Sequence, residues 1–510
     1  MLPLYKFYYF QQNIFLLLAE STYIYLLSAS NKFFMSKIIV GRTSEKSLLN
    51  EAFSSNESQF LAITGRRRIG KTYLINTYFE KHISFHFSGM LNASFGQQLQ
   101  NFQYSLSNFF KSENQSDIPA DWLTAFQNLS KCLQNSKKKG KQVIFIDELP
   151  WLDTHKSNFT SALDWFWNSW AVNRNVLLIV CGSSTSWIIN KIINNKGGLH
   201  NRITKRIHLE PFTLHETELF LNYQKIKLSK YQITQLYMSL GGVPHYLKEV
   251  KIGESALQAV DRICFQKDGL LVNEFDNLYK ALFKNSEIHL KVIFALASKL
   301  KGLTRNEILA LTKLNDGGGF TTILNELEWC NFIHIQHSFG RTKKDSLYRL
   351  SDEYSLFYIR FIHKQKSINW QLLAQSQKWK SWSGYAFENC CFKHIPQLKK
   401  ALGISNVFTE TSSYIYKSRI SDLEGTQIDL LIDRNDGVIN LCEAKFYDKP
   451  FVITKEYASK LRKKMGIFQS NTNSNKTIFP TLISTFGIQA NEHSIGFIQQ
   501  EVKLENLYEF

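Results

Sequence analysis

A glycine-rich loop early in the chain has the residue types and spacing of a phosphate-binding site. The apolar run 59–64 reads as a buried strand, leads into GxxxxGKT at 65–72, and is followed by a helical sequence. Glycines let backbone N–H groups wrap a phosphate, and the helix N-terminus adds positive potential. Lys71 would reach the β and γ oxygens of ATP, and Thr72 would offer its hydroxyl to Mg²⁺. The predicted nucleotide-binding residues of the loop are Gly65, Arg66, Arg67, Arg68, Ile69, Gly70, Lys71 and Thr72.

Two later apolar runs end in polar residues that would lie at one edge of a parallel sheet. The first, 143–146, ends in Asp147 and Glu148. Asp147 would hold Mg²⁺ through water and Glu148 would polarise the attacking water, which predicts hydrolysis as well as binding, with a solvated strand end as the alternative. The second run, 176–180, leads to Ser183, whose hydroxyl would contact the γ-phosphate or the water. A serine-rich turn is an equally simple interpretation of Ser183.

The C-terminal quarter holds a second group of acidic residues with a lysine beside it. Two strand-like runs, 427–433 and 438–445, are joined by a turn whose three-residue loop sets a register that places Asp429 opposite Glu443. Lys445 lies two residues further on and therefore on the same face of the strand.

This arrangement predicts a second metal site. Two carboxylates across a hairpin would hold Mg²⁺ and orient water for phosphodiester hydrolysis, with Lys445 alongside. Glu388, in the helical sequence upstream, would add a third ligand, so the predicted metal ligands are Glu388, Asp429 and Glu443. A structural cluster of cross-strand salt bridges is the alternative.

The elements between the two sites have the order of a DNA-binding module. Residues 281–365 read as three helices followed by two short strands, and the second helix opens with a capping box formed by Thr304 and Glu307. This is the order of a winged helix, in which 338–345 is the wing and the third helix, 320–328, would read the major groove of DNA. Packing against a neighbouring domain without DNA contact is the alternative.

Seven motifs together resemble the prokaryotic archaeal-type AAA/STAND-like ATPases, over about residues 36–510. The resemblance implies a P-loop core with an additional strand, a helical lid, a winged helix and a nuclease-like C-terminal domain. The motifs are GRRRIGKT (65–72), FIDELPWLD (145–153), SALDWFWNSW (161–170), CGSSTSW (181–187), GGLHNRI (197–203), LEPFTLHE (209–216) and GGVPHYL (241–247).

Two further expectations come from resemblance to known families, one for Arg202 and one for the C-terminal carboxylates. The resemblance to the ATPases makes Arg202, in GGLHNRI, an arginine-finger candidate. From the residues alone Arg202 is one cation among three with Lys205 and Arg206, and a phosphate contact, a DNA contact or a surface role fits equally well. The pattern around Asp429 and Glu443 resembles the PD-(D/E)xK nucleases, with Ile428 at the position of the family's proline.

We therefore predict an α/β multidomain chain with a P-loop core and a restriction-endonuclease-like α/β domain. The predicted divisions are an extension or misassigned start (1–34), the ATPase core (35–210), a helical lid (211–280), the winged helix (281–365), a linker (366–383) and the nuclease-like domain (384–510).

Length and charge narrow the class of protein. The 510 residues exclude a single small binding module, and the net charge of +18 favours a polyanionic partner, which predicts DNA rather than a membrane. The seven cysteines form no CxxC pair, which fits a reducing cytoplasm. The apolar start, 1–34, has no uncharged run long enough to span a bilayer, although peripheral membrane contact is an alternative for it.

The leading hypothesis is an ATP-hydrolysing switch coupled to DNA binding and Mg²⁺-dependent cleavage of DNA. A homo-oligomer is one expected form of this switch. The alternative is a regulatory ATPase whose nuclease-like domain only binds nucleic acid or protein.

Overall fold

The computed structural model describes residues 38–111, 117–194, 197–283, 285–341, 345–363, 369–416 and 425–509. Internal contacts divide the chain into two compact units, Met1–Val40 and Gly41–Phe510, and all elements below belong to the second. The predicted extension 1–34 lies outside the described residues. Within the described residues, no helix combines the length and apolar character required to cross a bilayer.

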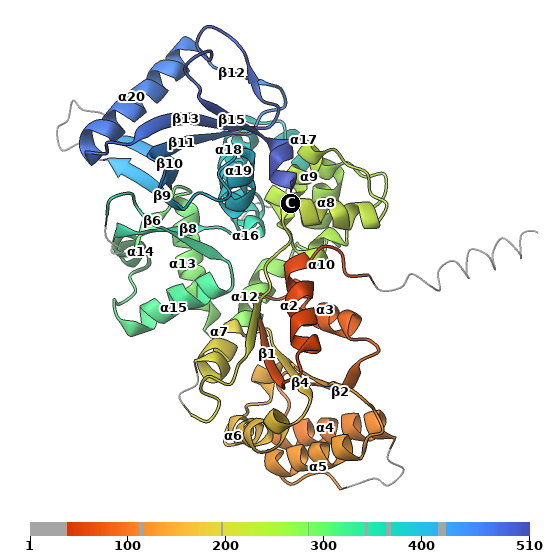
Figure 1. The fold of residues 1–510 in the computed structure, drawn as a ribbon. Helices are drawn as coiled ribbons and strands as arrows, with labels where there is room; N and C mark the ends of the chain where they lie inside the picture. Colours follow the sequence, from red (N-terminus) through yellow and green to blue (C-terminus); the bar gives the residue numbers. More distant parts are fainter. Residues whose placement is uncertain are drawn as a thin grey trace, which may run out of the picture. The chain divides into compact units, whose positions relative to one another are not determined.

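The first half of the chain is built on a five-stranded parallel sheet (Figure 1). Strand β1 is buried along its whole length, as is β4, because helices cover both faces. The insertion of β4 between β3 and β1 is the additional strand that the sequence resemblance predicts. In spatial order the strands are β2 (Ile83–Ser88), β3 (Gln142–Asp147), β4 (Val176–Cys181), β1 (Gln59–Thr64) and β5 (Lys205–His208). Their helices include α2 (Thr43–Ser54), α3 (Lys71–Tyr78), α4 (Phe95–Phe110), α5 (Trp122–Asn135), α6 (Phe159–Trp165) and α7 (Thr185–Trp187).

Helices and a small sheet follow. The sheet is antiparallel with the strand order β6-β8-β7, and Thr304 caps α14 through the predicted capping box with Glu307. The helical segment comprises α8 (Leu214–Tyr223), α9 (Lys230–Leu240), α10 (Pro244–Leu247), α11 (Ala256–Cys264) and α12 (Glu274–Leu282). The small-sheet unit comprises α13 (Ser286–Ser298), β6 (Leu303–Thr304), α14 (Arg305–Thr312), α15 (Gly318–Trp329), β7 (Ile333–Gln336) and β8 (Leu347–Leu350), followed by α16 (Glu353–Phe357).

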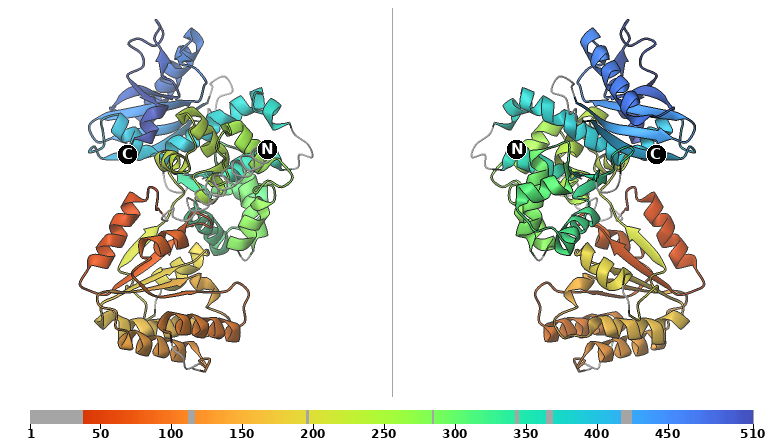
Figure 2. Two further views of the ribbon diagram at one scale, coloured as in Figure 1. Left: turned by 90° about the vertical axis from the view of Figure 1, so that its right-hand side faces the viewer. Right: turned by 90° about the vertical axis from the view of Figure 1, so that its left-hand side faces the viewer.

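The C-terminal unit is a mixed five-stranded sheet with helices on opposite faces (Figures 1 and 2). Leu430 packs in the same core cluster as Phe387 of α18, whereas its neighbour Leu431 packs with Phe468 of α20. The elements are α17 (Trp370–Leu373), α18 (Gln377–Lys393), α19 (Ile395–Ala401), β9 (Thr409–Tyr416), β10 (Thr426–Arg434), β11 (Val438–Lys445), α20 (Lys455–Thr472), β13 (Thr477–Ser484) and β15 (Gln500–Lys503), with the short pair β12 (Phe451–Val452) and β14 (Ile488–Gln489) at one side.

Helices occupy much of the predicted linker, 366–383. Residues 370–373 form α17, and α18 already begins at residue 377. Trp370, Trp379 and Trp382 are buried, and their rings contact one another and Phe361. The polar composition of the segment hid an apolar helix face that joins the small-sheet unit to the C-terminal unit.

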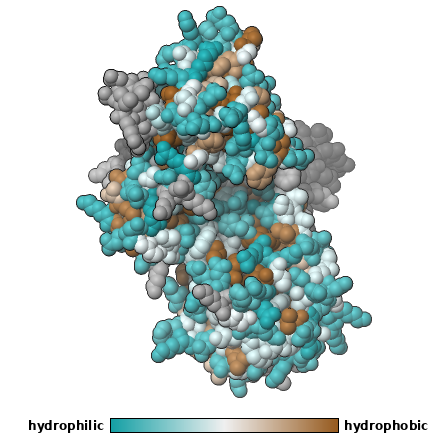
Figure 3. Space-filling view, turned by 60° about the vertical axis from the view of Figure 1, so that its left-hand side comes forward, coloured by the Kyte–Doolittle hydropathy of each residue, from teal (hydrophilic) through white to brown (hydrophobic). Residues whose placement is uncertain are grey.

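One continuous apolar cluster joins the three parts of the chain that follow the parallel sheet. It contains residues from the helical segment, such as Tyr237, from the small-sheet unit, such as Phe332, and from the C-terminal unit, such as Leu507. The parallel sheet has a separate cluster of its own. The described surface drawn in Figure 3 is mostly hydrophilic, with hydrophobic side chains in small separate groups.

Candidate functional sites

The glycine-rich loop leaves the end of β1 in a conformation that only its glycines allow. Gly65 has φ 127° and Gly70 has φ 91°, both in the region that favours glycine. A Cβ atom on Gly65 would lie 2.2 Å from the carbonyl oxygen of Leu209, so no larger residue fits. The loop ends at the N-terminus of α3, which supplies free backbone N–H groups for an anion.

Lys71 lies buried at the centre of this loop. Its Nζ donates to the carbonyl oxygens of Gly65 and Arg66, each at 2.7 Å. Burial lowers the pKa of Lys71, and Asp147 and Glu148 oppose that shift. The ammonium group is therefore held against the loop that would receive the phosphates.

The predicted Mg²⁺ residues meet beside it. The Thr72 hydroxyl donates to Asp147 Oδ2 at 2.6 Å, and the buried Cys181 thiol donates to Asp147 Oδ1 at 2.6 Å. Mg²⁺ takes oxygen ligands and usually completes its shell with water and substrate phosphates, so this hydroxyl and carboxylate fit the ion. Sequence reasoning did not find Cys181 as the partner that orients Asp147.

Glu148 adopts a left-handed backbone conformation at the end of β3, with φ 48°. Its Oε2 accepts hydrogen bonds from both the backbone N and the hydroxyl of Ser183, each at 2.8 Å. A left-handed glutamate is costly and persists where surrounding contacts hold it. Ser183 thus contacts and positions Glu148, a role different from the predicted contact with phosphate or water.

Arg202, the predicted arginine finger, is exposed in the turn before β5. It forms no ion pair with any residue that the structure describes. Lys205, by contrast, pairs with Glu51. The exposed position leaves the predicted role of Arg202 open and identifies no target for it within the described part of the chain.

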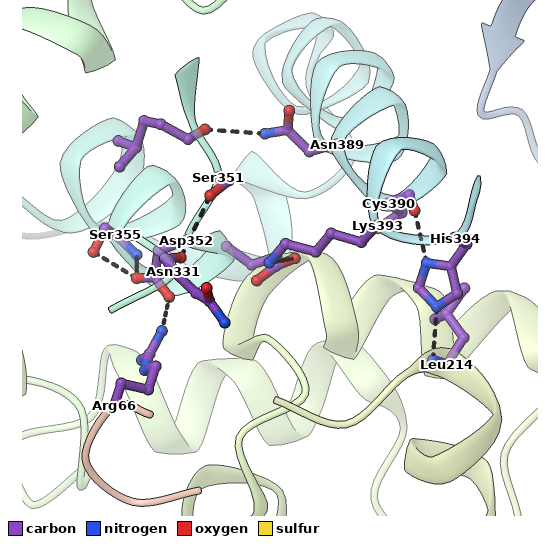
Figure 4. Close-up of polar contacts among 12 residues, drawn as sticks. Arg66, Leu214, Asn331, Ser351, Asp352, Ser355, Asn389, Cys390, Lys393 and His394 are labelled. Atoms are coloured by element: carbon purple, nitrogen blue, oxygen red, sulfur yellow. Dashed lines mark hydrogen bonds and ion pairs between the residues drawn. The ribbon is translucent and has the colours of Figure 1, made fainter. Parts of the chain in front are cut away.

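Two of the three loop arginines direct their side chains away from the phosphate cradle. Arg66 forms a buried ion pair with Asp352, which lies directly before α16 and is 1% exposed (Figure 4). Arg68 pairs with Glu274 of α12 at 2.8 Å. The backbone of the loop remains available for phosphate, but these two guanidinium groups connect the loop to the helical segment and to the small-sheet unit. Arg67 is half-buried.

Asp352 is held in its charged form by several contacts. Burial would raise the pKa of its carboxyl group, but Arg66 and the Ser355 hydroxyl outweigh burial and lower that pKa. Asp352 Oδ2 also accepts from the backbone N of Ser355 at 2.8 Å and thereby caps α16. The spacing of Asp352 and Ser355 is a capping signal that the sequence offers, although its arginine partner is not deducible from it.

The C-terminal carboxylates share one cavity, as predicted. Glu388 of α18, Asp429 of β10 and Glu443 of β11 all line it. Leu430 pairs with Cys442 across the antiparallel hairpin. This is the predicted register, in which the next position places Asp429 opposite Glu443. Lys445 Nζ lies 3.6 Å from Glu443 Oε2.

The carboxylates of this cavity are in different electrostatic states. Burial and the charge of Asp429 raise the pKa of Glu388, whose Oε2 atom is buried without a hydrogen-bond partner. For Glu443, Lys464 at 2.5 Å and Lys445 outweigh burial and lower the pKa. Among the three carboxylates, Glu443 therefore has the closest cation.

The predicted three-carboxylate metal site is not assembled in this arrangement. Among the described residues, no group of three or more His, Cys, Asp and Glu side chains is arranged to hold a metal ion. The hard oxygen donors nevertheless suit Mg²⁺, which needs only one or two carboxylates beside water and substrate oxygens. Asp429 and Glu443 would hold the ion and Glu388 would join them, and the ion would supply an activated water.

A residue that sequence reasoning missed lies among these carboxylates. Arg349, at the end of β8, reaches Glu388 Oε2 at 3.5 Å and Asp429 Oδ1 at 3.8 Å. Its side chain is 2% exposed. No local pattern singles out this arginine, because its partners come from elements that follow it in the chain by 39 and 80 residues.

Lysines line two neighbouring cavities beside the carboxylates. One cavity of about 1000 Å³ contains the three carboxylates, and the next, of about 540 Å³, shares Lys301 and Lys464 with it. We call the lysines of the second cavity the lysine groove: Lys299, Lys301, Lys460, Lys463 and Lys464.

Comparison with known proteins agrees with the geometry of the first site. Residues 39–250 match the family of ATPase domains found predominantly in Archaea. These residues form a P-loop ATPase domain. An uncharacterized protein of Methanocaldococcus jannaschii is 25% identical over 434 residues, which cover 84% of this chain and 92% of that protein.

Solved structures are similar to this chain at lower sequence identity. The Walker-type ATPase of Pyrococcus abyssi is 15% identical with a TM-score of 0.48, covering 63% of this chain and 96% of that one. The ORC2 protein of Aeropyrum pernix is 12% identical with a TM-score of 0.40, covering 64% and 94%. The fold of the ATPase domain is therefore assigned from its strand order and from the geometry of the glycine-rich loop.

Replacing Asp352 by Asn should strongly destabilise the protein. Asn still caps α16, but it leaves the Arg66 guanidinium buried without a counter-charge, and breaking a buried ion pair costs about 3–5 kcal/mol. The free energy of unfolding in urea measures this. Asp436→Asn, at an exposed ion pair with Arg434, is the matched control and should leave the unfolding midpoint unchanged. Equal midpoints for both variants would contradict the importance of the buried pair.

Replacing Lys71 by Ala should weaken ATP binding at least about tenfold, because charge-assisted hydrogen bonds to phosphate contribute roughly 1.5–3 kcal/mol. Titration calorimetry with a non-hydrolysable ATP analogue measures the affinity. Lys81→Ala, an exposed lysine beyond α3, serves as the control. Undiminished affinity in Lys71→Ala would exclude this loop as the phosphate site.

Replacing Glu148 by Gln should separate binding from turnover in the ATPase domain. The ATP affinity should persist, while the turnover rate should fall by about 10²–10⁴, the usual contribution of a general base. Ser183→Ala removes one of the two hydrogen bonds to Glu148 and should give a smaller loss of rate. A wild-type rate in Glu148→Gln would show that another group activates the water.

Proposed function

We propose that this protein couples ATP turnover in its P-loop domain to Mg²⁺-dependent cleavage of DNA by its C-terminal unit. The observation that carries the proposal is the single cavity in which Glu388, Asp429, Glu443 and Lys445 meet. Two carboxylates with a lysine beside them suit metal-assisted attack of water on a phosphodiester. The order of the strands and helices around the hairpin supports a restriction-endonuclease-like fold for this unit.

The lysine groove supports a polyanionic substrate. Lys301 and Lys464 border both the carboxylate cavity and the lysine groove, so a phosphate backbone bound along the groove would lead to the carboxylates. Lysines that contact phosphates supply affinity independent of base sequence. We therefore propose that the groove holds the sugar-phosphate backbone.

We propose a winged helix for the small-sheet unit, with a different contact from the one first expected. Helix α15, the predicted reader of the major groove, carries no lysine or arginine, and its Glu326 pairs with His289 at 2.8 Å. Arg341 of the predicted wing is exposed, while Lys343 and Lys344 lie outside the described residues. The basic residues that favour DNA contact are Lys299 and Lys301, on the loop between α13 and β6.

Other features extend the proposal. The seven cysteines are all free, which supports a reducing cytoplasm as the location. The exposed position of Arg202 is compatible with a finger that acts on the nucleotide of a neighbouring copy in a homo-oligomer.

A regulatory ATPase with a catalytically inactive nuclease-like domain is the second candidate. The observation that favours it is the cation already lying among the carboxylates, Arg349, in place of an assembled ligand group. Under this candidate the C-terminal unit binds nucleic acid or a protein without cutting.

Asp429→Asn should abolish Mg²⁺-dependent cleavage of plasmid and linear DNA, since it removes a charged metal ligand, and Lys445→Ala should do the same. Gel assays with and without ATP measure the cleavage. Asp433→Asn is the matched control: Asp433 lies on the same strand but pairs with Lys476 at 2.5 Å. A correctly folded wild-type chain that cuts no DNA or RNA under any of these conditions would leave the inactive candidate standing.

Replacing Lys301 and Lys463 together by Ala should weaken DNA binding and reduce the slope of log affinity against log salt by about 2, because each phosphate contact contributes about one unit. Fluorescence anisotropy over a salt series gives both quantities. The control is Lys81→Ala with Lys131→Ala, two exposed lysines of the ATPase domain. An unchanged slope would exclude the lysine groove as the DNA path.

A further inference from the structure

Arg349 reaches two carboxylates of the cavity from outside the C-terminal unit, although it does not itself line that cavity. It belongs to β8 of the small-sheet unit, yet its guanidinium lies between Glu388 and Asp429. Gln336 accepts a hydrogen bond from it at 3.3 Å, and the ring of Phe392 lies 4.7 Å from its Cζ. Contacts from three directions and near-complete burial fix the guanidinium in this position.

This cation lies beside the carboxylates that a divalent metal would need. Arg349 reaches Glu388 and Asp429, whereas Glu443 already has two lysines. A divalent ion bound by Glu388 and Asp429 would face a buried positive charge within a few ångströms, which low-dielectric surroundings make strongly repulsive. The guanidinium and the metal therefore compete for one site.

The chain links this competition to the P-loop. Asp352 is the partner of Arg66 (Figure 4). In the chain it follows Arg349 by three residues. Leu350 lies between them in the chain, and its carbonyl oxygen accepts a hydrogen bond from Asn389 at 3.3 Å. Glu353 follows Asp352 and pairs with Lys393 at 2.6 Å. We call residues 349–353 the strap.

The strap is attached both to the phosphate loop and to α18. Arg66 in the phosphate loop pairs with Asp352. Helix α18, which carries Glu388, contacts the strap on either side of Asp352, because Asn389 donates to Leu350 and Lys393 pairs with Glu353. Three residues span at most about 10 Å, so Asp352 cannot shift far relative to α18 without moving Arg349. Lys71 donates to the carbonyl oxygens of Gly65 and Arg66 in this structure, so a phosphate that takes up Lys71 would change the loop backbone at Arg66 and thereby shift its pair with Asp352.

We propose that Arg349 is an inhibitory cation that keeps metal out of the carboxylate cavity, and that the strap makes its release depend on nucleotide binding at the P-loop. The inference rests on the proposed nuclease function and adds its regulation. ATP can shift this equilibrium only by binding the released state more tightly, and by reciprocity the released state then binds ATP more tightly.

Mn²⁺ binding to the nucleotide-free full chain tests the first half directly, with free ions counted by electron paramagnetic resonance. Arg349→Met removes the charge and keeps most of the apolar volume, and it should bind Mn²⁺ at least tenfold more tightly than the wild type. The added site should disappear in Arg349→Met combined with Asp429→Asn. Equal or weaker Mn²⁺ binding in Arg349→Met would overturn the proposal.

A second variant keeps the test valid if Arg349→Met fails to fold. Phe392→Leu removes the ring under the guanidinium without changing any charge, and it should give a smaller gain in Mn²⁺ affinity. Arg341→Met, an exposed arginine of the same unit, should give none. No gain in Phe392→Leu, or an equal gain in Arg341→Met, would count against an inhibitory role for Arg349.

The affinity for an ATP analogue, measured in EDTA, tests the second half. Arg349→Met should bind the analogue at least threefold more tightly than the wild type, although residue 349 does not touch the loop. An unchanged affinity would overturn the dependence on the P-loop. If Mn²⁺ binding improves in Arg349→Met while neither chain cuts DNA, the proposed nuclease function fails and the inhibitory role of Arg349 stands.

Discussion

The buried ion pair between Arg66 and Asp352 is the contact on which the arrangement of this chain depends. Both side chains are almost completely removed from water, and a lone charge in such a place would be strongly destabilising. The pair therefore requires that the phosphate loop and the start of α16 stay together. Neighbouring contacts stabilise both charges: the Ser355 hydroxyl donates to Asp352, and the Arg66 guanidinium lies over the ring of Phe332.

Because of this pair, the P-loop serves two purposes with different atoms. Its backbone and Lys71 form the cradle for phosphate, while the guanidinium groups of Arg66 and Arg68 hold the two following units. Those units share one apolar cluster with the C-terminal unit. The Arg66–Asp352 pair therefore joins the phosphate loop to the body that contains the carboxylate cavity, and the strap connects Asp352 to Arg349 over three residues.

Local sequence patterns predicted the parts of the fold whose determinants lie close together in the chain. The strands around the P-loop, the Thr304 cap and the register that brings Asp429 towards Glu443 all follow from spacing over a few residues. The partners of Arg66 and Arg349 do not, since Asp352 lies 286 residues from Arg66 and a lone charged residue carries no mark of its partner. The helices within the predicted linker are not deducible for a related reason: Trp379 and Trp382 pack against Phe361, which lies outside that segment.

Amide hydrogen exchange along the strap gives the most direct measurement of the central claim that nucleotide binding reaches the carboxylate cavity through residues 349–353. The backbone N–H groups of Ser351 and Asp352 donate to the carbonyl oxygen of Phe332, and that of Ser355 donates to Asp352. Exchange of the two strap amides, and of the Ser355 amide that Asp352 binds, should become faster in the full chain when a non-hydrolysable ATP analogue binds, while the amides of strand β13 keep their rates. Unchanged exchange along the strap at saturating analogue would contradict the claim.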